Sequence, residues 1–193
     1  HLAHSYLSLG RYSLSKNIAE EMLRGPLPAE YRIGLHVVMG DILLAENSQY
    51  DAFLHYMRAL TEDPDKVTAD QIKSSIEDIV SHRLSREELT AAWNVYKDSY
   101  PGGYIAYTLA QEYYAAGDLV NAGHYVDEYL DRYKEHPRYD DARALKQRLV
   151  EVTVVDRYAL GCILPLSGKY ARFGTMALDA VMLMAQAWEF KRE

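Results

Sequence analysis

One pattern recurs along most of this 193-residue chain at nearly constant intervals. Gly10, Asn47 and Gly117 each stand between two stretches of helical periodicity, and a weaker copy of the pattern lies at His82. Gly and Asn tolerate the left-handed backbone conformation that ends a helix, so the pattern predicts turns between paired helices. The four positions are 37, 35 and 35 residues apart, which indicates a stack of repeated helical hairpins.

Helical periodicity and helix-end signals divide the sequence around these turns. The sequence predicts helices over residues 2–9, 13–24, 29–46, 49–62, 68–82, 86–99, 103–116, 119–135 and 138–151. Ser85 and Glu88 form a capping-box pattern, and Pro101-Gly102-Gly103 is expected to stop the helix before it. We expect the charge-rich last helix to cover the final apolar face of the stack.

Small and aromatic residues recur at corresponding places in the paired helices. They include Gly40, Ala52, Tyr56, Ala59 and Pro64 in the second pair, and Leu109, Ala110, Tyr113, Ala122 and Pro137 in the fourth. With the spacing, these residues resemble the tetratricopeptide repeat family over residues 1–151. The resemblance implies an all-α fold, a right-handed α-α superhelix of four hairpins plus a capping helix. The third hairpin lacks the small residues and matches by spacing and helix signals.

The composition changes after residue 151. Residues 152–155 and 158–164 are β-branched or apolar runs of strand length, and residues 165–170 read as a loop. Helical periodicity returns from Gly174. This order predicts a short β-strand and helix, the first half of a βαβ unit, so residues 152–193 are expected to be the truncated start of an α/β domain. One strand and one helix cannot bury a sheet face by themselves.

A second resemblance lies in this segment. Residues 160–174, followed by Ala177-Leu178-Asp179, resemble the start of a type I periplasmic binding domain. The segment is similar to branched-chain amino-acid receptors and, with helical repeats in front, to the penicillin-binding protein activators of the bacterial outer membrane. Lys169 departs from the proline that family members often have there. The resemblance implies a periplasmic lipoprotein, anchored to the outer membrane, that stimulates a peptidoglycan synthase.

Charge and composition disfavour some kinds of binding partner and some locations of the chain. A formal charge of −7 and a pI near 5.5 disfavour nucleic acid, which needs a basic surface. No apolar run reaches the roughly 18–20 residues that span a membrane. Cys162 is the single cysteine and is expected in a buried strand. Because the chain opens at His1 without an initiator methionine, we expect either an excised segment or a mature chain, and no targeting signal is read from it.

The sequence offers little for catalysis. The seven histidines have no metal-ligand spacing, and no pair of carboxylates is placed for acid–base work. Ser167-Gly168-Lys169 lacks the first glycine and the following Ser or Thr of a phosphate-binding loop. We therefore expect a non-enzymatic protein with no metal and no cofactor.

The first candidate site follows from the repeat family, in which the first helix of each hairpin lines a concave groove. This implies groove positions at Tyr104, Tyr107, Gln111 and Tyr114 in the fourth hairpin, and at Gly34, Val37, Asp41 and Leu44 in the second. Aromatic rings with polar tips on a rigid helix make good partner contacts. The alternative is that the tyrosines pack between hairpins. Val37 and Asp41 do not supply the Lys and Asn that clamp a peptide carboxylate.

The second candidate site is the loop before the last helix, which borders the ligand cleft in the binding-domain family. Its residues are Ser167, Gly168, Tyr170, Phe173 and Gly174. A glycine-containing turn before a helix presents free backbone N–H groups to an anion or a ligand carboxylate. The alternative is a plain strand-to-helix turn.

Three functions remain open from sequence. The first is a scaffold of the bacterial envelope that docks a protein partner, with a peptidoglycan synthase as the implied partner. The second is a repeat-bearing solute receptor that binds an amino acid or similar small ligand, which would require a complete C-terminal domain. The third is an assembly-type repeat lipoprotein.

Overall fold

The computed structural model describes residues 2–153 and 162–189 and divides into two compact units, unit 1 (His1–Thr153) and unit 2 (Val154–Glu193). Every regular element in the described ranges is helical, which confirms the predicted all-α class there. Unit 1 contains α1 (Leu2–Ser8), α2 (Tyr12–Leu23), α3 (Ala29–Ala45), α4 (Gln49–Thr61), α5 (Lys66–His82), α6 (Arg86–Tyr96), α7 (Gly102–Ala115), α8 (Leu119–Arg132) and α9 (Tyr139–Thr153). Unit 2 contains the 3₁₀ turn η1 (Gly168–Tyr170) and α10 (Ala171–Glu189).

The turns of unit 1 lie where the repeated pattern predicted them. Gly10, Asn47 and Gly117 have φ angles of 69°, 59° and 76°, in the left-handed region that these residue types tolerate. The weaker copy after His82 lacks such a residue, since Arg83 has a φ of −125°. Local sequence therefore fixes three of these four turns through backbone conformation.

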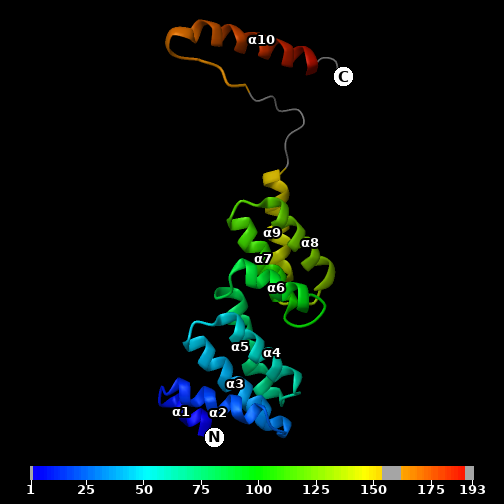
Figure 1. Ribbon diagram of the computed structural model, residues 1–193. Coiled ribbons are helices and arrows are strands. Elements are labelled where there is room, and N and C mark those ends of the chain that lie inside the picture. Colours follow the sequence, from blue (N-terminus) through cyan, green and yellow to red (C-terminus); the bar gives the residue numbers. More distant parts are fainter. Residues whose placement is uncertain (1, 154–161, 190–193) are drawn as a thin grey trace. The chain divides into compact units, whose positions relative to one another are not determined.

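Consecutive helices of unit 1 pack as pairs, and the pairs follow one another along the unit (Figure 1). α1 packs on α2, α3 on α4 and α7 on α8, while α2, α4 and α8 each contact the helix that follows. Gly40 makes the α3–α4 contact possible, because a Cβ atom there would lie 2.7 Å from Cζ of Tyr56. Gly40, one of the recurring small residues, thus lies at a close approach of α3 and α4.

The third pair differs from the others. α5 packs against α4 and α7, and α6 packs against α7, but α5 and α6 barely touch one another. The fourth residue after the N-cap of α2, α4, α6 and α8 is fully buried in each case: Ser15, Ala52, Leu89 and Ala122. Leu89 is the only large residue of these four. Its side chain occupies the space that is left empty in the other pairs, where the two helices approach closely.

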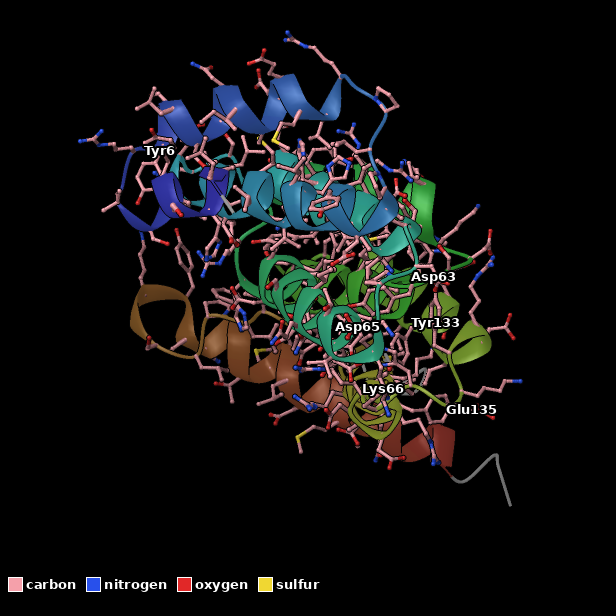
Figure 2. The ribbon with its side chains drawn as sticks, turned by 90° about the horizontal axis from the view of Figure 1, so that it is seen from below. Tyr6, Asp63, Asp65, Lys66, Tyr133 and Glu135 are labelled. Carbon is pink, nitrogen blue, oxygen red and sulfur yellow. The ribbon has the colours of Figure 1, made fainter. Side chains whose placement is uncertain are left out.

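Capping residues fix several helix starts. The Ser85 side chain accepts a hydrogen bond from the Glu88 backbone, and the Glu88 side chain accepts one from Ser85 in return, so the predicted capping box is confirmed. Asp65, labelled beside Lys66 in Figure 2, caps α5 by accepting hydrogen bonds from the backbone N–H groups of Val67 and Thr68. One expected helix end was wrong: α6 already ends at Tyr96, and Gly102 opens α7.

The apolar core of unit 1 falls into two clusters of buried side chains. The smaller one joins α1, α2 and α3 around residues such as Ala19, Leu35 and Ile42. The larger one runs from Leu43 on α3 to Leu149 on α9. α9 buries one face in this cluster, with Ala142, Leu145 and Leu149 nearly inaccessible to solvent.

Unit 2 lacks the predicted strand in its described part. Val152 and Thr153, expected to begin a strand, end α9 instead, and residues 154–161 lie outside the described residues. Residues 162–164 have no regular structure, and Cys162 is exposed rather than buried. A strand is defined by hydrogen bonds to a neighbouring strand, and this segment has no such partner among the described residues. None of the described helices is both long and apolar enough to cross a membrane.

Candidate functional site: a groove along α3

A groove of about 460 Å³ runs along α3 in unit 1 and is bounded by α1 and the start of α5. We call it the α3 groove. Its lining comes mainly from one helix and is mostly apolar. The lining residues are Leu2, Ala3, His4, Met22, Glu30, Tyr31, Ile33, Gly34, Leu35, Val37, Val38, Asp41 and Thr68.

The periodicity of α3 explains why this helix forms the floor. Residues three, four and seven apart share one face of a helix, so Glu30, Gly34 and Asp41 form a single row. Tyr31 and Val37 flank the row, and Tyr31 is 54% exposed. The opposite face of α3 is buried, with Met39 and Leu43 nearly inaccessible. The groove is therefore the solvent side of a helix whose other side is core.

Asp41 is held in place at one end of the groove. The Tyr56 hydroxyl donates a hydrogen bond to its carboxylate at 2.5 Å. Burial raises the pKa of Tyr56, and the hydrogen bond to Asp41 raises it further, so the phenol stays protonated and remains a donor. The carboxylate keeps free lone pairs for a further donor from the groove side.

The predicted groove positions of the second hairpin divide into two groups. Gly34, Val37 and Asp41 line the α3 groove, although Val37 is half-buried. Leu44 is not part of the lining and packs against the larger core cluster. Sequence reasoning did not identify Glu30, Tyr31 or the contribution of α1, since those follow from how the hairpins stack.

The predicted positions of the fourth hairpin lie elsewhere. Tyr107 is only 7% exposed, its ring lies 5.8 Å from that of Tyr129, and the Arg138 guanidinium lies over its face. Tyr104 is half-buried, with its ring 4.3 Å from that of His136. These two tyrosines therefore pack against α8 and the turn that follows it, and Tyr107 is not an exposed anchor.

The other two positions on α7 are more open. Gln111 is exposed and donates a hydrogen bond to the Tyr107 hydroxyl at 3.3 Å. Tyr114 is half-buried against the larger core cluster. None of the four α7 positions lines the α3 groove.

His136 organises an aromatic cluster that the sequence did not reveal. Its Nδ1 lies 2.7 Å from the Tyr129 hydroxyl, and burial lowers its pKa, as does the nearby Arg138. A Cβ atom on Gly103 would lie 2.6 Å from the imidazole, so this glycine admits the ring. In the sequence, the pair Gly102-Gly103 was the feature that could have indicated this cluster. It marks a close approach of other residues to α7 rather than the end of a helix.

The predicted loop in unit 2 is a turn followed by a helix. Gly168 has a φ of 76°, and Ser167 forms no capping hydrogen bond through its side chain. Tyr170 and Phe173 are exposed at 57% and 68%. Gly174 is buried, and a Cβ atom there would collide with the backbone of Pro165. These residues form a compact turn with two exposed rings.

Within the part of the chain that the structure describes, no group of three or more His, Cys, Asp or Glu side chains could hold a metal ion. Comparison with known protein families, with curated proteins and with solved structures gave no match to this chain.

Proposed function

We propose that unit 1 is a protein-interaction scaffold of the tetratricopeptide-repeat type, a right-handed superhelix whose first helices form a concave binding surface. The observation that carries the proposal is the α3 groove, which lies between the first helices of successive hairpins. Three positions proposed from sequence, Gly34, Val37 and Asp41, line it. An apolar floor with a few fixed polar groups on rigid helices suits recognition of a peptide segment.

The repeated local features support the same proposal. Left-handed turns at Gly10, Asn47 and Gly117 end the first helices of three pairs. Small residues let the two helices of those pairs approach closely, and α9 covers the last pair. Such stacking is how repeat proteins build extended surfaces for partners.

We further propose that the scaffold belongs to the bacterial envelope, in a periplasmic lipoprotein of the outer membrane that activates a peptidoglycan synthase. The support is the resemblance of residues 160–174 to the start of a type I periplasmic binding domain. A longer chain carrying that complete domain would also be able to bind a small ligand. A ligand-induced rise in melting temperature for such a chain would favour the solute-receptor function instead.

A matched pair of glycine substitutions tests the docking function. Gly34 and Gly123 both lie inside helices, and at both positions the space around a Cβ atom is empty to 4 Å. Gly34→Gln fills the α3 groove, whereas Gly123→Gln on α8 adds the same side chain outside it. We expect the unmodified chain and Gly123→Gln to capture a peptidoglycan synthase from bacterial envelope extract, and Gly34→Gln to lose it. Equal capture by all three proteins would contradict the proposal.

A further inference from the structure

Gly34 is not required by the packing of the described chain. It lies in the interior of α3, it is exposed, and nothing lies within 4 Å of the position of a Cβ atom. Glycine weakens a helix interior relative to alanine. Gly40, six residues later on the same helix, differs because Tyr56 fills the space beside it. The absence of a side chain at Gly34 therefore leaves the floor of the groove open to a close approach from outside.

Two carboxylates flank this opening. Glu30 lies about one turn before Gly34 and Asp41 about two turns after it, on the same face of α3. At about 1.5 Å of rise per residue, they are about 16 Å apart along the helix. Neither forms an ion pair with any described residue.

The basic residue nearest to Glu30 in the sequence, Arg32, does not pair with it. Arg32 pairs with Glu62, and one of its guanidinium nitrogens donates to the Leu27 carbonyl at 2.6 Å. The groove lining contains two acidic residues, Glu30 and Asp41, one histidine, His4, and neither Lys nor Arg. The groove thus presents an apolar floor with negative charge at both ends.

We propose that the α3 groove binds a segment of a protein partner that places a small residue over Gly34 and a Lys or Arg near each of Glu30 and Asp41. The inference rests on the proposed docking function and adds the chemistry of the partner. Small residues allow backbones to approach closely, and opposite charges at the two ends select the partner and fix its register. An acidic segment would meet two like charges.

The test uses the 193-residue chain and a phage library of random dodecapeptides. We expect enriched peptides to carry basic residues on both sides of a small or apolar centre. Glu30→Lys should weaken binding of an enriched synthetic peptide at least about tenfold. Glu135→Lys is the matched charge reversal outside the groove, in the exposed turn labelled in Figure 2, and should leave binding within about twofold.

Gly34→Ala adds a readout that a merely structural role would not produce. The melting temperature of the free chain should rise, because alanine favours the helix, while peptide binding falls. Gly123→Ala should also raise the melting temperature but leave binding unchanged.

The outcomes separate this inference from the docking function. Enriched peptides that are acidic or uncharged, and that Gly34→Gln prevents from binding, would overturn the charge inference and leave the docking function intact. Enriched peptides that bind Gly34→Gln as well as the unmodified chain would overturn both, as would a library with no enrichment.

Discussion

The Nδ1 atoms of His36 on α3 and His55 on α4 lie 3.1 Å apart, with their ring centroids separated by 5.2 Å. Both rings are half-buried. A hydrogen bond between two such nitrogens requires that one of them carry a proton and the other accept, so two imidazolium ions cannot share this geometry. At least one ring of this pair, which links α3 to α4, is therefore neutral.

Acidification should destabilise this hairpin. Burial lowers the pKa of both rings, and the neighbouring His36 helps to lower that of His55 to about 4. Unfolded histidine has a pKa of about 6.5. The contribution of these histidines to the free energy of unfolding is therefore fully present above that pH and is lost as the pH falls from about 6.5 towards about 4. We expect the free energy of unfolding to fall by about 1–2 kcal/mol between about pH 7.5 and pH 5, allowing for partial exposure. Urea titrations followed by circular dichroism measure it.

The control removes the titrating groups. His36→Gln combined with His55→Gln keeps polar side chains at both positions but has no proton to gain. In the unmodified chain Arg58 and Lys16 disfavour a positive charge on His55, and Asp51 favours it. All three residues remain in the double variant. A pH dependence in the double variant equal to that of the unmodified chain would show that the pair is not its source. His136, whose pKa burial also lowers, contributes a dependence of the same sign to both proteins.

Two alanine substitutions on α3 should have opposite effects on stability. Gly40→Ala places a methyl group against the Tyr56 ring, which is 2% exposed and bonded to Asp41, and should cost about 1–3 kcal/mol. Gly34→Ala enters empty space and should stabilise the helix by about 0.5–1 kcal/mol. Chemical denaturation of both variants under the same conditions compares them. A stability gain from Gly40→Ala would mean that α3 and α4 are not in close contact.

The elements that sequence predicted well are those set by local chemistry. The turns at Gly10 and Asn47 need a left-handed residue, and the start of α6 needs a capping pair, so both can be read from a few neighbouring residues. The strand expected from Val152 depended on β-branched residues, whose preference is weak when no partner strand is present. The helix before them simply continues through Thr153.

The candidate site was harder to predict because it depends on which helix covers which face. Val37 and Tyr107 both fit the helical period of a groove position. α8 and the turn after it cover Tyr107, whereas α3 retains an open side next to Val37. That difference depends on how separate helices pack against one another, so periodicity within one helix could not show it.

The crossing position of the third helix pair gives a further prediction. Leu89 is fully buried at the place where Ala52 stands in the second pair. Leu89→Ala should leave a cavity and cost about 2–5 kcal/mol. Ala52→Leu should force α3 and α4 apart and cost about 1–3 kcal/mol. Thermal melts measure both, and a neutral Ala52→Leu would show that the second pair tolerates the wider spacing of the third.

Tyr107→Ala should act on stability rather than on partner binding. The side chain is nearly inaccessible and lies against Tyr129 and Arg138, so its removal should cost about 3–5 kcal/mol. Gln111→Ala removes the exposed neighbour that donates to the Tyr107 hydroxyl and should cost less than about 1 kcal/mol. Tyr107→Phe keeps the ring and should behave like Gln111→Ala. A folded, fully stable Tyr107→Ala protein that fails to capture the partner would instead place Tyr107 in the binding surface.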